Sequence, residues 1–360
     1  MNARIRVLVV EDSLTIRKYL CEVLAADPQF EVVGEAEDGK RAIELCQALR
    51  PHVITMDMMM PLMTGLSATE FIMAHCPTPI LIVSSSTNRG DLFKTYDALA
   101  AGAVDVLDKP SGEEADAQWE RKLISAVRLV SRIPVITHPR ARLAGYRQSV
   151  HTGREYSVAP WSTRRFEVIG MGASTGGPGA IVDVLRGLPA DFALPILLVL
   201  HIGELFGEAF ADWLDGQTAR RVCYAKDGLS VDKLAGRVVM APSGWHMMVQ
   251  SGQIRLSKNA ERHSCRPSVD VLFESLAIEY GANAVACLLT GMGRDGAAGM
   301  LAMRRAGAYT IAQDEASSVV YGMPREAVLL GAAERSLPLG EIGAHLAAVV
   351  RQAAMEGTNE

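Results

Sequence analysis

The first third of the chain alternates between short apolar runs and longer amphipathic segments. The apolar runs predict strands at residues 5–10, 31–36, 53–56, 80–83 and 104–107. Between them, apolar residues recur three or four positions apart, which predicts helices at residues 14–25, 39–49, 65–75, 91–100 and 119–130. Five successive strand–helix repeats favour a doubly wound parallel sheet. The pattern therefore predicts an α/β domain over residues 1–130.

A polar stretch at residues 131–165 interrupts this pattern. It carries seven arginines against one acidic residue, Glu155, and no hydrophobic periodicity runs through it. Such a composition is typical of a linker between domains. The positive charge leaves a docking surface as an alternative, but a solvated tether is favoured.

A second series of apolar runs and amphipathic segments begins at residue 166. It predicts strands at residues 166–170, 195–200, 237–240, 284–289 and 308–312. The helices are predicted at residues 178–187, 205–215, 268–280, 296–306 and 324–331. A turn at Gln250–Gln253 predicts a hairpin between 247–249 and 254–256. We therefore expect a second α/β domain with a doubly wound parallel sheet over residues 166–355.

Composition limits the class of protein. The chain has 360 residues, of which 49% are apolar and 21% charged, as in ordinary globular proteins. A net charge of −5 gives no general reason to expect nucleic acid or an anionic membrane as a partner. The apolar run near the N-terminus is too short for a signal peptide, and none approaches the roughly 20 residues that span a bilayer. Six scattered cysteines fit buried thiols in a reducing compartment. We expect a cytoplasmic protein without membrane insertion.

One serine stands in a sequence typical of a nucleophile. The segment Gly172-Ala-Ser174-Thr-Gly176 follows an apolar run and precedes a predicted helix. Its spacing, G-x-S-x-G, is typical of a nucleophile elbow, where a serine lies exposed on a tight strand-to-helix turn. A serine needs a base to remove its proton. His201 follows the next apolar run and Asp295 a later one, and parallel strands bring their carboxyl ends to one edge of a sheet. These three residues are the candidate catalytic set.

Three other interpretations compete for Ser174. An α/β-hydrolase would place its acid before its histidine, whereas here His201 comes first. A dinucleotide-binding turn would need a third glycine where Thr175 stands, and an acid near the end of the second strand. The simplest alternative is that Ser174 only caps the helix and that His201 is a hydrogen-bonded core residue.

The first domain carries a cluster of polar residues at its predicted strand ends. Glu11 and Asp12 follow the first strand, Asp57 the third, Ser84 the fourth and Lys109 the fifth. Carboxylates that converge repel one another unless a hard cation such as Mg²⁺ binds to their oxygens. A lysine and a hydroxyl beside them would complete a pocket for a phosphoryl group. Taken singly, each of these residues is as well explained as a cap on a strand end.

Together with Asp57-x-x-Met60-Pro61-x-x-x-Gly65 and Lys109-Pro110, this cluster resembles the receiver domain of bacterial two-component response regulators. The resemblance extends over residues 5–130 and implies a flavodoxin-like fold. It implies that Asp57 accepts a phosphoryl group and that Ser84 and Lys109 sense the acyl phosphate.

The same resemblance implies a Mg²⁺ site. Asp12 and Asp57 would bind the ion directly, Glu11 would act through water, and the carbonyl of Met59 would complete the site. One position departs from the pattern, because Val106 stands where many receivers carry an aromatic switch residue.

Longer segments of the second domain resemble the chemotaxis protein-glutamate methylesterases. The segments that carry the resemblance occur in order at residues 172–177, 201–202, 266–273, 290–301 and 311–327. The resemblance implies a Rossmann-like domain with Ser174 as nucleophile, His201 as general base and Asp295 as the residue that orients the imidazole. It also implies that backbone N–H groups of Thr175 and Met292 bind the oxyanion.

Two positions depart from the methylesterase pattern. Gly203 stands where many members have proline, and Arg294 where many have asparagine. Two further histidines, His246 and His263, are candidates for lining the same cleft, with a packing or surface role as the alternative.

The resemblance implies a phosphorylation-activated esterase. Its substrate would be glutamate γ-methyl esters on methylated chemoreceptors, with glutamine deamidation as a second activity, and the hydrolysis would need no cofactor. A chemotaxis-type histidine kinase would supply the phosphoryl group. The competing class is a non-catalytic response regulator whose second domain only binds a signalling partner. A DNA-binding output is weaker, because residues 166–355 contain no basic recognition helix.

Overall fold

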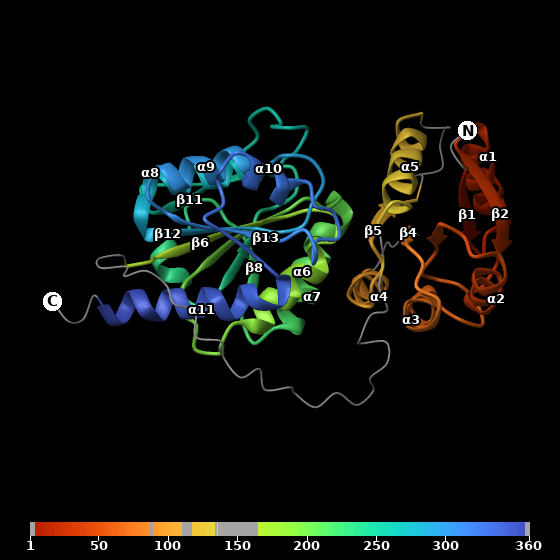
Figure 1. The fold of residues 1–360 in the computed structure, drawn as a ribbon, viewed down its shortest axis with the longest axis horizontal. Coiled ribbons are helices and arrows are strands. Elements are labelled where there is room, and N and C mark those ends of the chain that lie inside the picture. The colour runs from red at the N-terminus through yellow and green to blue at the C-terminus, as the bar shows by residue number, and fades with distance from the viewer. Residues whose placement is uncertain (1–3, 86–88, 110–116, 134, 136–164, 357–360) are drawn as a thin grey trace. The chain divides into compact units, whose positions relative to one another are not determined.

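The computed structural model describes residues 4–85, 89–109, 117–133, 135 and 165–356. It divides the chain into two compact units, residues 1–148 and 149–360 (Figure 1). Most of the predicted linker, residues 136–164, lies outside the described residues. Within the described ranges, no helix is long and apolar enough to cross a membrane.

The first unit is built on a five-stranded parallel sheet with the order β2-β1-β3-β4-β5. Its strands are β1 (Ile5–Val10), β2 (Phe30–Ala36), β3 (Val53–Met56), β4 (Ile80–Ser84) and β5 (Asp105–Asp108). Its helices are α1 (Leu14–Ala26), α2 (Gly39–Leu49), α3 (Gly65–His75), α4 (Arg89–Ala100) and α5 (Ala117–Val130). Helices α1 and α5 cover one face, and α2, α3 and α4 cover the other (Figure 1). The strand order is that of flavodoxin-like folds, as predicted.

Local chemistry fixes where the helices of this unit begin. The Asp38 carboxylate accepts a hydrogen bond from the N–H of Arg41 at 2.9 Å at the start of α2, and the Thr64 hydroxyl caps α3 in the same way. Gly65 opens α3 directly under the loop after β3. A Cβ atom there would collide with the carbonyl oxygen of Asp57, so this glycine is required for the close approach.

The second unit contains a seven-stranded sheet with the order β14-β13-β12-β6-β7-β9-β8, in which every neighbouring pair is parallel. Its strands are β6 (Val168–Ala173), β7 (Ile196–Leu200), β8 (Val222–Tyr224), β9 (Val238–Met240), β12 (Ala284–Leu288), β13 (Tyr309–Gln313) and β14 (Arg335–Leu337). A separate antiparallel hairpin consists of β10 (His246–Gln250) and β11 (Gln253–Ser257), as the turn at Gln250 predicted.

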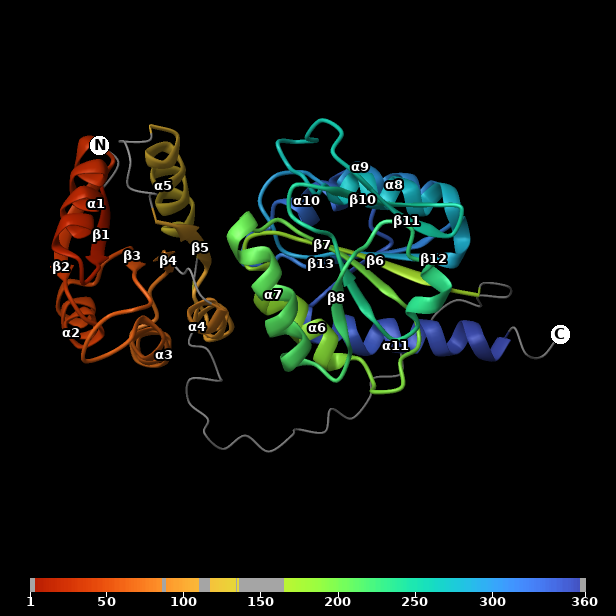
Figure 2. The ribbon, with the colours of Figure 1, turned by 180° about the vertical axis from the view of Figure 1, so that it is seen from behind.

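Helices lie on both faces of the larger sheet. They are α6 (Gly177–Gly187), α7 (Glu204–Gln217), α8 (Val269–Glu279), α9 (Ala297–Arg305), α10 (Met323–Leu329) and α11 (Leu339–Glu356), with short 3₁₀ helices η2 (Val231–Leu234) and η3 (Gly281–Asn283). Helices α8, α9 and α10 cover one face, and α6, α7 and α11 cover the other, as the two opposite views show (Figures 1 and 2). The architecture confirms the predicted fold class of two doubly wound α/β units.

Glycines allow two close helix contacts in this unit. Gly170 and Gly172 lie on β6 directly beneath α8, where added Cβ atoms would collide with Phe273, Leu276 and Val269. On the opposite face, α11 crosses α6 at Gly187 and Gly343, and a Cβ on Gly343 would lie 2.5 Å from the carbonyl oxygen of Val184. Glycines therefore let α8 approach the central strand β6 closely, and let α11 approach α6 closely.

The structure differs from the predicted elements at four places. Strand β6 spans residues 168–173 rather than 166–170, because the chain stays extended through Gly170 and Gly172 under α8. The short edge strands β8 and β14 and the whole of α11 were not predicted. Three-residue strands carry too few residues for a period-2 pattern. Helix α11 does have an apolar stripe, with Ile342, Leu346 and Val349 buried, and this signal was available in the sequence.

Candidate active site

The structure places the three candidate catalytic residues at the carboxyl ends of three adjacent strands. Ser174 follows β6, His201 follows β7, and Asp295 lies in the loop after β12. Backbone hydrogen bonds join these ends. The N–H of Ser174 donates to the carbonyl of Thr290 at 3.0 Å, and the N–H of His201 donates to the carbonyl of Ala173 at 3.0 Å. The strand-end argument from the sequence is confirmed for these positions.

Ser174 lies on a tight turn between β6 and α6. The N–H of Gly177 donates to the carbonyl of Ser174 at 2.7 Å, and Gly176 adopts a φ of +75°, which favours glycine. The Ser174 residue is partly exposed. The neighbouring loop passes so close that a Cβ on Gly291 would lie 2.8 Å from the Cβ of Ser174. This is the geometry expected of a nucleophile elbow.

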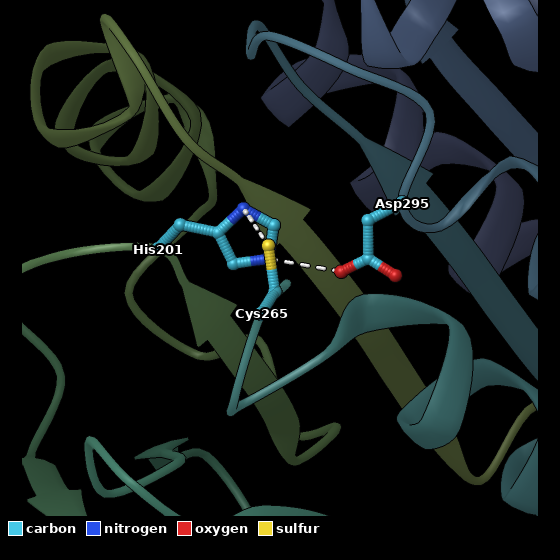
Figure 3. Close-up of side chains that lie close together, drawn as sticks. All are labelled: His201, Cys265 and Asp295. Carbon is cyan, nitrogen blue, oxygen red and sulfur yellow. Dashed lines mark hydrogen bonds and ion pairs between the residues drawn. The ribbon is translucent and has the colours of Figure 1, made fainter. Parts of the chain in front are cut away.

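His201 and Asp295 form a partly buried pair (Figure 3). The Nε2 atom of His201 lies 2.9 Å from Oδ2 of Asp295, whose side chain is only 3% exposed. Asp295 also accepts hydrogen bonds from the Ser268 hydroxyl at 2.7 Å and from the N–H groups of Val269 and Asp270 at 2.7 and 3.1 Å. The carboxylate thus lies at the N-terminus of α8, where backbone N–H groups favour negative charge.

These contacts keep Asp295 ionised. Burial alone would raise the pKa of Asp295, but the hydrogen bond and charge of His201, followed by the hydrogen bonds from Ser268 and Val269, hold the pKa below its ordinary value. For His201, burial favours the neutral ring, whereas the hydrogen bond to Asp295 and the contact with Cys265 favour the charged ring. The balance raises the pKa of His201 to about 9.

The second ring nitrogen of His201 faces a cysteine rather than the serine. Its Nδ1 atom lies 3.8 Å from Sγ of Cys265, as Figure 3 shows. Among the described residues, no hydrogen bond joins the Ser174 hydroxyl to the imidazole. The structure therefore assembles the histidine–carboxylate pair and places Ser174 on the adjacent strand end, without closing the serine–histidine contact. Cys265 is a residue of this site that the sequence pattern did not predict.

The two backbone groups expected to bind an oxyanion lie beside Ser174. Met292 follows Gly291 in the adjacent loop, and its N–H donates to no acceptor within the described part of the chain. Its side chain is 57% exposed. The carbonyl of Thr175 accepts from the Thr290 hydroxyl at 3.0 Å, which fixes the turn against the same loop. Both positions are compatible with the expected role, which stays a prediction.

The two additional histidines take part in the structure around this site. His246 is buried, and its Nδ1 atom accepts from the N–H of Ser268 at 3.2 Å. His263 pairs with a second buried carboxylate, Asp270, at 3.0 Å and contacts Arg294 through its other nitrogen. Both histidines thus support the N-terminal end of α8 rather than serving as the partner of Ser174.

The first unit gathers its polar cluster at the carboxyl edge of its sheet. The Nζ atom of Lys109 lies 2.8 Å from Oε2 of Glu11 and 3.1 Å from Oδ1 of Asp57, and all three side chains are at least nine-tenths buried. Glu11, Asp12 and Asp57 each offer a carboxylate oxygen within 4.8 Å of the others. Ser84 is buried at the end of β4, and its carbonyl accepts from the N–H of Lys109 at 3.0 Å. These five residues converge as predicted.

Burial of the carboxylates changes their protonation. Burial, and after it the charge of Asp57, raises the pKa of Glu11 to about 7 against the opposing effect of Lys109. Burial also raises the pKa of Asp57, again opposed by Lys109. A single lysine thus leaves the cluster short of positive charge. Hard oxygen donors in such surroundings fit a divalent cation.

The Met59 residue lies in the loop that follows Asp57, with a 41% exposed side chain whose sulfur is 3.7 Å from Nζ of Lys94. The structure gives no contact for its carbonyl oxygen, which stays a predicted ligand.

Comparison with known proteins agrees with both domains. Residues 169–346 match the family model described as CheB methylesterase, and residues 7–117 match the response regulator receiver domain. A relative from Anaeromyxobacter dehalogenans, named protein-glutamate methylesterase/protein-glutamine glutaminase 2, is 44% identical over 94% of this chain and 95% of its own length. A relative of the same name from Pseudomonas aeruginosa is 44% identical over 98% of both chains.

Solved structures of separate domains are also similar. The Thermotoga maritima CheB methylesterase catalytic domain is 33% identical, covers 51% of this chain and 99% of that domain, and has a TM-score of 0.49. The response regulator domain of Thermotoga maritima CheB is 39% identical over 36% of this chain and 98% of that domain, with a TM-score of 0.34.

The fold, the strand-end sites and the two matching models define a response regulator whose receiver precedes a methylesterase domain. The similarity to the two relatives extends over nearly the full length of both chains, so it identifies the family as well as the class. The chain belongs to the protein-glutamate methylesterase/protein-glutamine glutaminase family.

Proposed function

We propose that the second unit hydrolyses glutamate γ-methyl esters on methylated chemoreceptors, and that phosphorylation of the first unit activates it. The observation that carries this proposal is the hydrogen-bonded His201–Asp295 pair beside the Ser174 turn. The names of the relatives supply the substrate class, and they add deamidation of protein glutamine as a second activity. Methanol release from methylated receptor, measured with and without a small-molecule phosphodonor, tests the proposal.

The geometry supports an acyl-enzyme mechanism. The Ser174 oxygen attacks the ester carbonyl while Nδ1 of His201 takes its proton, because Nε2 is held by Asp295. The bond from carbon to the methoxy group then breaks, and His201 returns the proton so that methanol leaves. Water attacks the acyl-serine in the same way and releases glutamate. In a glutamine side chain the leaving group would be ammonia.

Two other parts of the site support this sequence of steps. Asp295 remains a carboxylate throughout, as its lowered pKa indicates, and stabilises the imidazolium that forms. The N–H of Met292 lies in the loop that touches Ser174, where a donor would stabilise the negative oxygen of the intermediate. The Nδ1 atom of His201 contacts Cys265, and it must exchange this contact for one with Ser174 before it can accept the serine proton.

The hydrolysis should depend steeply on pH. His201 must be neutral to accept a proton, and a pKa of about 9 leaves about 1% of the rings neutral at pH 7. We therefore expect kcat/KM to rise with pH and to level off near pH 9. The measurement is a pH–rate profile on a methylated receptor. The hydrogen bond and charge of Cys265 help to raise the pKa of His201. In the C265A variant we therefore expect kcat/KM to increase at a lower pH than in the wild type. A wild-type profile that is flat from pH 6 to 9 would contradict this base assignment.

The first unit is the proposed phosphoacceptor. Glu11, Asp12 and Asp57 would hold Mg²⁺, which supplies charge neutralisation for transfer of a phosphoryl group to Asp57. Lys109 contacts Glu11 and Asp57 and so is placed to sense a new charge there. A chemotaxis-type histidine kinase is the proposed phosphodonor.

Replacement of Asp57 by asparagine is expected to abolish activation. The wild-type rate should rise about ten- to a hundredfold on addition of a small-molecule phosphodonor, since an active fraction of about 1% at rest permits no more than a hundredfold increase. The D57N variant should keep the resting rate with or without the donor. The matched control is D27N, because Asp27 lies outside the cluster and pairs with Arg128. Full activation of D57N would exclude Asp57 as the acceptor.

A further inference from the structure

Cys265 occupies the position beside His201 that a nucleophile would need. Its sulfur is 3.8 Å from Nδ1, while Nε2 of the same ring is engaged by Asp295. The cysteine forms no disulfide and is half-buried, so small reagents can reach it, and its thiol also donates to the carbonyl of His263 at 3.4 Å. The three side chains form a continuous thiol–imidazole–carboxylate array (Figure 3). The imidazole lies where it can take up the proton of the thiol as the sulfur reacts, and Asp295 stabilises the imidazolium that then forms.

The loop that carries Cys265 is held in place by several contacts. Arg262 and Cys265 exchange two backbone hydrogen bonds, of 3.1 and 2.9 Å, around a two-residue turn. Both turn residues, His263 and Ser264, have positive φ values of 53° and 59°, which side chains disfavour. Such a conformation persists only where the surroundings enforce it.

Side-chain contacts with α8 hold this turn in its conformation. Arg262 forms a two-bond pair with Glu274 of α8 at 2.5 and 2.7 Å, and His263 lies 3.0 Å from Asp270 on the same helix. Helix α8 also donates the backbone N–H groups that hold Asp295. The sulfur and the carboxylate are therefore positioned on the two sides of one imidazole by a single helix.

The other five cysteines lack this environment. Burial raises the pKa of Cys21 to about 11 and that of Cys287 to about 12, and it also raises the pKa of Cys223. Cys46 and Cys76 contact each other at 3.7 Å in the first unit, and this contact lowers the pKa of Cys46 to about 7. Both side chains are buried, which shields them from reagents. Within the described residues, only Cys265 contacts a histidine that is itself paired with a carboxylate.

We propose that Cys265 is a reactive thiol and a site of reversible oxidation by peroxides, and that its oxidation blocks ester hydrolysis. The second part rests on the proposed esterase function. In the reaction the thiolate attacks peroxide, the S–O bond forms, and the O–O bond breaks. Sulfur is oxidised to a sulfenic acid, peroxide is reduced, and the second oxygen leaves as water with the proton from His201.

Oxidation at this position would remove the base from Ser174. The added oxygen lies on the sulfur that faces Nδ1, so it holds the ring nitrogen in a hydrogen bond and occupies space beside it. The remaining nitrogen is engaged by Asp295. His201 then has no nitrogen left to accept the serine proton. Thiol reductants restore the free sulfur and with it the base.

The first test measures thiol reactivity directly in the full chain. Iodoacetamide labelling at pH 7, followed by peptide mapping, gives a rate for each cysteine. We expect Cys265 to react at least about ten times faster than Cys21 and Cys223, the other half-buried cysteines. In the H201A variant that excess should disappear, while the rates at Cys21 and Cys223 stay the same and report an intact fold. The proposal that Cys265 is a reactive thiol is overturned if the three cysteines are labelled at equal rates in the wild type. It is also overturned if Cys265 still reacts faster than the other two in H201A.

The second test connects the thiol to hydrolysis. Wild-type protein treated with hydrogen peroxide should lose most of its methanol release and regain it with dithiothreitol. The C265A variant, under the same treatment, should lose none. Equal inactivation of both proteins, or no inactivation of the wild type, overturns the proposal that oxidation of Cys265 blocks ester hydrolysis. The labelling rates need no ester hydrolysis, so they still support or overturn the reactive thiol if the proposed esterase activity itself fails.

Discussion

Replacement of Ser174 by alanine is expected to lower ester hydrolysis by about 10⁴-fold or more. Members of a catalytic triad act as a unit, so loss of the nucleophile removes the covalent route altogether. The fold should survive, because the Ser174 hydroxyl makes no hydrogen bond within the described residues and the turn is held by backbone contacts. The measurement is kcat for methanol release, with thermal unfolding as a check on folding.

A matched variant separates this loss from a general effect of removing a hydroxyl. Ser336 lies exposed on the edge strand β14, and S336A should keep wild-type turnover. If S174A retained near-normal turnover, Ser174 would not be the nucleophile. Cys265 would then be the next residue to test, because its sulfur already contacts Nδ1 of His201.

Replacement of Asp295 by asparagine is expected to lower turnover by about 10²- to 10⁴-fold. The carboxylate accepts from His201, Ser268 and two backbone N–H groups, and an amide cannot accept at both of its ends. Its NH₂ group would therefore face either the imidazole together with the N–H of Val269, or the Ser268 hydroxyl together with the N–H of Asp270. The imidazolium would lose its stabilising charge in either case. Stability should also fall, by about 1–3 kcal/mol, since a buried donor is left without a partner.

The neighbouring Asp270 provides the control for this second prediction. It is equally buried at the start of α8, but it pairs with His263 and not with His201. The D270N variant should therefore lose stability while keeping most of its turnover per folded molecule. Turnover and unfolding should be measured on both variants. Equal loss of turnover in D270N and D295N would mean that the network acts by supporting α8 rather than by orienting His201.

Strand ends were the part of the site that the sequence predicted best. Ser174, His201 and Asp295 each follow an apolar run, and parallel strands necessarily bring such positions to one edge. The sequence pattern does not give the order of the strands in the sheet, so it could not predict which strand ends are neighbours. The order β12-β6-β7, which makes the three residues neighbours, is visible only in the structure.

The position of Cys265 shows where sequence reasoning stops. Its contact with His201 spans 64 residues and depends on a turn in which His263 and Ser264 adopt positive φ values. Neither residue type predicts such a turn, because glycine and asparagine are the usual occupants. The pairing of Nε2 with Asp295 and of Nδ1 with Cys265 depends on the same placement. These features arise from tertiary packing around α8 rather than from local pattern.

Helix α11 has a practical consequence for shortening or extending this protein. It crosses α6 at Gly187 and Gly343, and α6 begins directly after the turn that carries Ser174. Helix α11 therefore packs against the helix that follows the nucleophile turn, although it lies more than 160 residues from Ser174 in the sequence. A truncation at residue 338 would leave every catalytic side chain in place and still expose the apolar side of α6. Fusion partners and affinity tags are better attached beyond residue 356 than inside this helix.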